Sequence, residues 1–233
     1  MRITILHDAK DIGKHVGDVF EETLHSNPKA VLGLATGSSP LPIYADLIAR
    51  YQKGAISFRE ATTFNLDEYL DCPLKDQTYR FFMNHNLFGS IDLRKGQTHF
   101  PNPHHPENYD DEIAQAGGVD LQLLGIGRDG HIGFNEPGTP FDSLTHIVTL
   151  AESTLEANAR FFGNDPHRVP KQAVTMGLGT ILKAKRIILV ADDPSKRAAI
   201  EKLMSHQKDV EWPATVLNDH PNVDVFITED VLH

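Results

Sequence analysis

The sequence predicts one doubly wound α/β domain, modified Rossmann-like, in which helices cover both faces of a mostly parallel sheet. Short apolar, β-branched segments alternate with amphipathic segments along the chain, and its 233 residues suffice for one large domain. This alternation implies right-handed crossovers between parallel strands. No internal repeat or linker-like segment interrupts the order, so we expect a single domain over residues 1–233.

The expected strands are short apolar segments with the composition of a buried sheet. They lie at residues 2–6, 30–34, 61–66, 119–127, 145–150, 186–191 and 223–228. The amphipathic segments between them predict helices near residues 10–25, 40–52, 78–89, 106–116, 151–162, 177–183 and 194–206. Ligands of such sheets bind outside the carboxyl ends of the strands, so a motif that directly follows a strand is a candidate for the site.

Composition limits the possible partners. A net charge of −10 argues against sequence-independent nucleic-acid binding, which needs a basic face. No apolar run approaches the roughly 20 residues of a membrane span, and the N-terminal segment is charged too early for a signal peptide. The single cysteine, Cys72, excludes an internal disulfide and suits a reducing compartment. We expect a cytoplasmic protein without nucleic-acid or membrane partners, in which local Arg and Lys would bind any anionic small molecule.

A turn rich in Gly and Ser follows the second expected strand and precedes Pro40. Its residues are Thr36, Gly37, Ser38 and Ser39. Pro is tolerated in a first helical turn, because its missing N–H would be unpaired there. Glycine lets the backbone approach a ligand, and hydroxyls and free helix N–H groups can point at it, which suits a phosphate. The simpler alternative is that Ser39 only caps the helix.

Two adjacent carboxylates, Asp67 and Glu68, end the third expected strand. Such a pair in a loop is commonly solvated. The pair lies at the carboxyl rim of an apolar sheet, so one carboxylate could instead be a general base. Partial burial would raise its pKa toward the range that such a base needs. One of the two is therefore a candidate base.

The most informative segment follows the fourth expected strand and places two carboxylates and an imidazole in one Gly-rich loop. Its members are Asp129, His131 and Glu136. Neighbouring carboxylates can hold a histidine in one tautomer and keep it basic enough to move protons near neutral pH. A lone histidine is more often structural, but this clustering favours a catalytic role.

Two other interpretations compete for this loop. Residues 125–130 read GIGRDG, a GxGxxG pattern, and Glu152 follows about 20 residues on, as in a dinucleotide-binding fingerprint. That site requires a helix directly after the glycines, whereas further Gly and Pro residues follow here. A metal site is disfavoured because His131 and Glu136 lack the helical HExxH spacing. We expect neither a metal nor a cofactor.

Two cations complete the set of candidates. Arg160 lies near the end of the expected helix 151–162, and Lys196 lies in the first turn of the last expected helix. Each alone could be an ordinary surface cation. Lys196 is less ordinary, because a cation in a first helical turn opposes the helix dipole unless an anion is bound there.

The chain resembles the glucosamine-6-phosphate deaminase family in six motifs taken together, which are TGSSP, FNLDEY, GRDGHIGFNEP, ARFF, VPKQAVTMGLGT and DPSK. They follow one another in the family's order, and the combination of FNLDEY with DGHIGFNEP is the most specific. The resemblance implies an isomerising deaminase, a hydrolase of carbon–nitrogen bonds. Its reaction would convert glucosamine 6-phosphate to fructose 6-phosphate and ammonium, in amino-sugar catabolism and the use of N-acetylglucosamine.

The resemblance also implies a role for each candidate residue. Asp67 would carry a proton between C2 and C1 of the open-chain sugar. His131 would assist ring opening, with Asp129 and Glu136 orienting it. The residues that would hold the 6-phosphate are Thr36, Gly37, Ser38, Ser39, Arg160 and Lys196. The segment 151–171 would form a mobile lid that closes over the substrate and excludes water.

The chain departs from the longer, allosteric members of that family. Where they have basic residues in the strand after FNEP, residues 144–148 read LTHIV, and the chain lacks their C-terminal extension. We expect no activation by N-acetylglucosamine 6-phosphate, and a monomer or small homo-oligomer. The related 6-phosphogluconolactonases have a DGH-type loop that FNEP does not follow, and they provide the alternative activity. A non-catalytic sugar-phosphate sensor is a further alternative.

Overall fold

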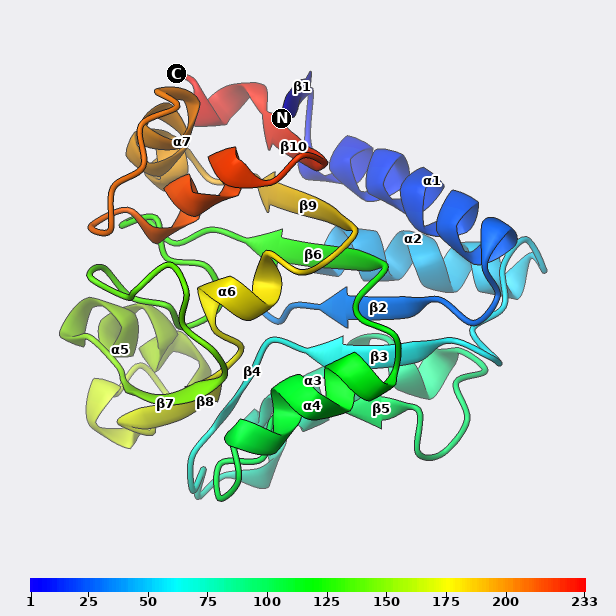
Figure 1. Cartoon of the computed structure of the whole chain (residues 1–233), viewed down its shortest axis with the longest axis horizontal. Helices are drawn as coiled ribbons and strands as arrows, with labels where there is room; N and C mark the ends of the chain where they lie inside the picture. Colours follow the sequence, from blue (N-terminus) through cyan, green and yellow to red (C-terminus); the bar gives the residue numbers. More distant parts are fainter.

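Seven strands form the central sheet of the protein in this computed structural model, which describes residues 1–233 (Figure 1). The strands are β1 (Arg2–Leu6), β2 (Val31–Leu34), β3 (Thr62–Asn65), β5 (Thr98–His99), β6 (Leu121–Gly125), β9 (Arg186–Ala191) and β10 (Val223–Thr228). Their order in the sheet is β1-β10-β9-β6-β2-β3-β5, and every neighbouring pair is parallel. The predicted fold class is confirmed, and six of the seven expected strands lie in this sheet.

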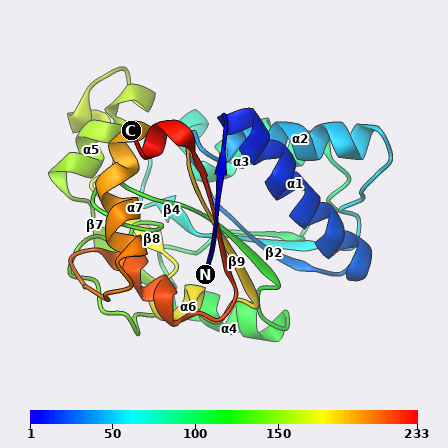
Figure 2. The same cartoon turned by 90° about the horizontal axis from the view of Figure 1, so that it is seen from above.

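Two hydrophobic cores, one on each face of the sheet, hold the helices in place. The main helices are α1 (Ala9–Ser26), α2 (Leu41–Gln52), α3 (Tyr79–Asn86), α4 (Glu107–Gln115), α6 (Leu178–Ile181) and α7 (Arg197–Met204). On one face, α1, α2 and α3 contribute to a cluster of 23 buried residues. On the other face, α4, α6 and α7 contribute to a cluster of 27 (Figure 2). None of the helices combines the length and the apolar composition that crossing a membrane requires.

A second, antiparallel sheet lies beyond the carboxyl ends of the central strands. It consists of β4 (Asp67–Tyr69), β8 (Gln172–Thr175) and β7 (His146–Thr149), in that order. The expected strand 145–150 therefore exists, but it pairs with β8 outside the central sheet. The sequence does not predict β4, β5 or β8, because strands of two to four residues are too short for a periodicity to be recognised.

Two expected helices end earlier than their sequence pattern indicates. The segment 151–162 forms α5 (Glu152–Asn158) followed by a 3₁₀ turn, η3 (Ala159–Phe161). The segment 78–89 forms α3 followed by a second 3₁₀ turn, η2 (Phe88–Ser90). Helices commonly tighten in this way at their carboxyl ends, because 3₁₀ bonds satisfy carbonyl groups that the α-helix leaves free. Because a 3₁₀ turn has fewer residues per turn than an α-helix, the side chains of η3 do not continue the faces of α5.

The carboxyl ends of β2, β6 and β9 point to the same side of the molecule, toward the small antiparallel sheet (Figure 1). Because β6 lies between β9 and β2 in the strand order, the loop after β6 lies between the loops after the other two strands. Three of the motifs predicted from sequence occupy these three loops. The tertiary structure therefore assembles one rim from segments far apart in the chain.

The side chain of Gln122 fills the space beside Gly33 in the central sheet, so no side chain fits at position 33. A Cβ at this position would lie 2.0 Å from Oε1 of Gln122, which is fully buried on β6. We expect Gly33→Ala to lower the free energy of unfolding by roughly 1–3 kcal/mol through overpacking, measured by chemical denaturation. The double variant Gly33→Ala/Gln122→Ala should lose less than the sum of the two single effects. Additive losses would contradict this explanation.

Candidate active site

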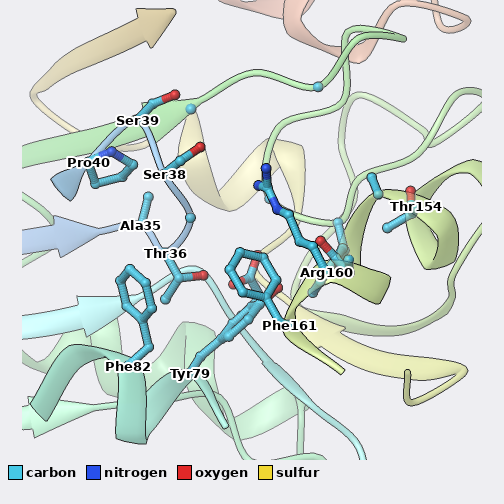
Figure 3. A pocket seen from close by; sticks show the side chains of 18 of the residues that line it. Ala35, Thr36, Ser38, Ser39, Pro40, Tyr79, Phe82, Thr154, Arg160 and Phe161 are labelled. Carbon is cyan, nitrogen blue, oxygen red and sulfur yellow. The ribbon is translucent and has the colours of Figure 1, made fainter. Parts of the chain in front are cut away.

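A cavity of about 790 Å³ opens at the carboxyl rim of the central sheet. Its wall combines the loops after β2, β6 and β9 with β4, α3, α5 and η3. Figure 3 shows side chains from these separate segments directed toward the same space. The predicted site residues in its lining are Thr36, Gly37, Ser38, Ser39, Asp67, Asp129, His131, Arg160 and Lys196. Glu136 is the one predicted site residue that is not part of the lining.

The turn after β2 forms one end of the cavity. Gly37 has a φ of +113°, a backbone conformation that residues with a side chain rarely adopt. Ser39 makes no capping bond to α2. Its Oγ instead donates a hydrogen bond to Oδ1 of Asp192, 2.5 Å away, after β9. The simpler interpretation of Ser39 as a helix cap is therefore wrong, and the hydroxyl joins two loops of the rim.

Both predicted cations line the same cavity as this turn. Arg160 extends from η3 toward Ser38 in Figure 3, and its guanidinium also lies 4.7 Å from the centre of the Phe161 ring. Lys196 follows β9 and lines the same cavity. Burial lowers the pKa of Lys196, and the positive charges of Arg128 and Arg160 lower it further, while Asp193 opposes the change. Several cations therefore converge on one end of the cavity.

Asp67 lines the cavity from a buried position. It belongs to β4, where its backbone pairs with Thr175 of β8, and the residue is 6% exposed. Burial raises the pKa of Asp67 to about 8, and the nearby charge of Glu68 adds to the increase. No hydrogen-bond donor of the protein offsets this effect. The carboxyl group is thus buried, unpaired and open to the cavity.

Glu68, the adjacent carboxylate, has a different environment. Its Oε1 accepts hydrogen bonds from the backbone N–H groups of Tyr69 and Tyr79, each at 2.9 Å. Its Oε2 accepts one from Arg80 N at 3.0 Å. These donors include the first free N–H groups of α3, where a negative charge is stabilised by the helix dipole. Glu68 therefore anchors α3, and Asp67 alone faces the cavity.

His131 and Asp129 form a hydrogen-bonded pair that also lines the cavity. Nδ1 of His131 lies 2.7 Å from Oδ1 of Asp129, which also accepts the backbone N–H of His131 at 3.2 Å. Burial alone would raise the pKa of Asp129, but the hydrogen bonds and charge of His131 hold it at about 2. An ionised Asp129 favours the tautomer with the proton on Nδ1, so Nε2 is left to exchange a proton.

Glu136 lies behind His131. The residue is 9% exposed, and its Oε1 accepts a hydrogen bond from Oγ1 of Thr154 at 2.7 Å. Its Oε2 has no hydrogen-bond partner and lies 3.9 Å from Nδ1 of His131. At this distance Glu136 acts on the histidine through charge, whereas Asp129 forms the direct bond.

Gly133 brings the His131 loop against Asp67. It has a φ of +60°, and a Cβ here would lie 2.9 Å from Oγ1 of Thr175 and 3.5 Å from Oδ2 of Asp67. Asp67 and His131 therefore open onto one cavity. The spatial relationship that the sequence interpretation required is present in the structure.

The two competing interpretations of this loop can be compared with the geometry. Turns, and no helix, follow Gly130, so the dinucleotide fingerprint lacks the helix that it requires. Ligand atoms of Asp129, His131 and Glu136 lie within 4.8 Å of one another, close enough to consider a metal ion. However, Nδ1 of His131 is engaged by Asp129 and one oxygen of Glu136 by Thr154, which fits a hydrogen-bonded array better than a set of free metal ligands.

Sequence reasoning missed several lining residues. Arg128 stands inside the GRDGH motif, so its position after β6 was a usable signal. Tyr79 and Phe82 of α3 also line the cavity, as does Thr154 of α5 (Figure 3). No local pattern marks these three residues. They reach the cavity because Glu68 anchors α3 and Glu136 holds α5.

The parallel sheet, with its cavity at the carboxyl ends of the strands, defines an α/β enzyme that binds a small molecule at this rim. The chain belongs to the family of glucosamine-6-phosphate isomerases/6-phosphogluconolactonase, which it matches over residues 7–226. This family confirms the resemblance inferred from the motifs.

Individual relatives agree. The chain is 43% identical to the glucosamine-6-phosphate deaminase of Thermoanaerobacter pseudethanolicus, over 99% of this chain and 93% of the relative. It is 43% identical to glucosamine-6-phosphate deaminase 2 of Bacillus subtilis, over 97% and 94%. A solved monomeric glucosamine-6-phosphate deaminase superposes with a TM-score of 0.96 at 39% identity, covering both chains fully. The 6-phosphogluconolactonase of Thermotoga maritima, at 20% identity and a TM-score of 0.77 over 98% and 99%, shares the fold.

The burial of Asp67 has a consequence for stability. Its pKa of about 8 in the folded protein exceeds the ordinary value of 3.8, so between these values the unfolded chain binds fewer protons and the folded protein loses stability as pH rises. An asparagine side chain at this position could not ionise. We therefore expect Asp67→Asn to raise the melting temperature, by an amount that grows between about pH 4 and about pH 8.

The measurement compares melting temperatures of the two proteins at about pH 5 and about pH 8. Glu60→Gln is the matched control, because it removes one negative charge from an exposed position. A difference between Asp67→Asn and wild type that stays constant over this range would contradict the prediction.

Proposed function

We propose that the protein converts glucosamine 6-phosphate and water to fructose 6-phosphate and ammonium. The observation that carries this proposal is a buried, unpaired Asp67 facing the same cavity as the Asp129–His131 pair, which Arg128, Arg160 and Lys196 also line. The names of the relatives agree with it. Lactone hydrolysis needs an activated water but no transfer of a carbon-bound proton, and the lactonase neighbours support the fold alone.

The phosphate of the substrate binds where the cations converge. Arg160 and Lys196 supply charge, and the turn from Thr36 to Ser39 supplies hydroxyl and backbone donors. Phosphate is remote from the reacting carbons, so its binding energy orients C1 and C2 before the chemistry begins. The protein as a whole carries a net charge of −10, but salt screens charges over roughly 10 Å. The local cations can therefore attract an anionic substrate.

Ring opening comes first. His131, with one proton held on Nδ1 by Asp129, accepts the proton of the C1 hydroxyl at Nε2 and delivers it to the ring oxygen as the bond from C1 to that oxygen breaks, so that the open-chain aldehyde forms. The negative charge of Asp129 stabilises the imidazolium that appears during this step. Glu136 adds a second negative charge at longer range.

Asp67 then moves the carbon-bound proton. Its carboxylate removes the proton from C2 while the ammonium group of the substrate gives a proton to the aldehyde oxygen, which leaves an enol with a hydroxyl on C1 and a neutral amine on C2. Returning the proton from Asp67 to C1 gives an iminium ion at C2. Water adds to this carbon and ammonium leaves, so that the ketone of fructose 6-phosphate forms. The apolar setting that raises the pKa of Asp67 also makes the carboxylate a stronger base.

Three further properties belong to the same proposal. The segment 151–171 acts as a lid, supported by Arg160 on η3 and by a hydrogen bond from Asn158 to Tyr69 Oη at 3.0 Å. The protein is a monomer or small oligomer, as its monomeric solved relative suggests, and N-acetylglucosamine 6-phosphate does not activate it. It works in the cytoplasm without metal or cofactor, in the breakdown of amino sugars.

Ammonium release from a panel of sugar phosphates tests the reaction. We expect release from glucosamine 6-phosphate in the presence of a chelator, and a fall in kcat of at least about a hundredfold in Asp67→Asn, with substrate binding largely kept. Acid production from 6-phosphogluconolactone without ammonium would instead identify a lactonase. Binding of sugar phosphates without any turnover would identify a sensor.

The pH dependence of kcat/KM tests Asp67 as the base. Only its ionised form removes a proton, so kcat/KM should rise with pH up to about 8. The charge of Glu68 contributes to this high pKa, and Glu68→Gln should therefore move the rise to lower pH. The control Glu60→Gln removes an exposed charge and should leave the profile unchanged. A profile that Glu68→Gln does not shift would argue against Asp67 as the titrating group.

A further inference from the structure

Arg128 is a cation of the cavity to which neither the motifs nor the proposed mechanism assigns a role. It lines the cavity in the loop after β6. Because β6 lies between β2 and β9, this loop lies between the turn that carries Ser38 and the loop that carries Lys196. Arg128 therefore occupies the middle of the end at which an anion would bind.

The guanidinium of Arg128 is held by a hydrogen bond but forms no ion pair. Its Nε donates a hydrogen bond to Oγ of Ser195 at 3.1 Å, which directs the group toward the loop of Lys196. None of the ion pairs in the protein includes Arg128, Arg160 or Lys196. The two terminal nitrogens of Arg128 form no hydrogen bond with the protein. They match the spacing of two oxygens of a phosphate.

The charges themselves indicate that an anion belongs among these residues. Burial lowers the pKa of Lys196, as do the positive charges of Arg128 and Arg160, whereas the charges of Asp193 and Asp129 raise it. Asp193 also accepts a hydrogen bond from Ser195 N at 2.8 Å. Three cations and two carboxylates leave a net positive charge here, which a bound phosphate dianion would neutralise.

Arg128 is also mechanically joined to the His131 loop. It is one of the two central residues of a β-turn, closed by a hydrogen bond from Gly130 N to Gly127 O at 3.1 Å, and Asp129 is the other. Gly127 N in turn donates to His131 O at 2.8 Å. A Cβ on Gly127 would lie 2.2 Å from Nδ1 of His131, so the turn is packed directly on the imidazole.

We propose that Arg128 is a third phosphate-binding cation, and that phosphate held by Arg128 orders the turn that carries Asp129 and His131. Arg128 is then both a ligand of the phosphate and a positioning residue for Asp129. Of the two central residues of this turn, Arg128 binds the phosphate and Asp129 orients His131, so phosphate binding stiffens the proton-transfer groups. The natural ligand, a sugar phosphate, follows from the proposed function, but binding of phosphate itself does not depend on it.

Titration of the isotope-labelled protein with inorganic phosphate, followed by amide NMR signals, tests the proposal without any turnover. In the wild type we expect the amides of Ser38, Ser39, Gly130 and His131 to respond with one dissociation constant. In Arg128→Gln the dissociation constant should rise about tenfold, which corresponds to about 1.4 kcal/mol. The amides of Gly130 and His131 should no longer respond, while those of Ser38 and Ser39 still should.

Two further variants separate charge and geometry from general effects. Arg128→Lys keeps the charge but loses the paired donors, so it should restore most of the affinity and little of the response at Gly130. Arg197→Gln is the control of equal charge, because Arg197 pairs with Glu201 at 2.8 Å and does not line the cavity. Its phosphate affinity should stay within about twofold of wild type, a difference of about 0.4 kcal/mol.

Phosphate affinity in Arg128→Gln within about twofold of wild type would overturn the binding role. An unchanged response at Gly130 and His131 in that variant would overturn the coupling. Neither result depends on ammonium release, so a failure of this inference can be told apart from a failure of the proposed reaction.

Discussion

The burial of one unpaired carboxyl group, Asp67, is the constraint on which the cavity depends. A buried carboxylate without donors is costly, and a protein retains one only where the surrounding structure holds it in place. Here β4 pairs with β8, so that the backbone of Asp67 is fixed opposite Thr175, and Gly133 brings the neighbouring loop against the carboxylate. The small antiparallel sheet thus holds a chemically unfavourable group where a substrate can reach it.

Neighbouring groups in the sequence acquire opposite properties because the fold gives them different surroundings. Asp67 meets no donor and its pKa rises, whereas Glu68, the next residue, accepts three backbone N–H groups and anchors α3. Around the histidine, Asp129 forms the direct bond and Glu136 is turned toward Thr154. The four acidic side chains around this site therefore differ in the contacts that each one makes.

The same contacts join the cavity to the segment that would cover it. Thr154 of α5 donates to Glu136, and Asn158 at the other end of this helix donates to Tyr69 on β4. The helix is therefore attached both to the loop of His131 and to the strand of Asp67. Arg160 follows on η3 and extends toward Ser38 (Figure 3). A displacement of this segment would alter both ends of the cavity together.

Sequence alone determined the doubly wound class, six strands of the central sheet and nearly all candidate residues. Apolar segments that alternate with amphipathic ones, and Gly-rich turns after strands, are local signals that can be recognised in the sequence. It also indicated that Asp129, His131 and Asp67 belong to one site. Only the tertiary structure decided that the expected strand 145–150 leaves the central sheet, that Ser39 binds Asp192 and that Glu136 lies outside the cavity lining. These features depend on which segments pack together. Contacts between residues far apart in the chain produce no periodic pattern in the sequence.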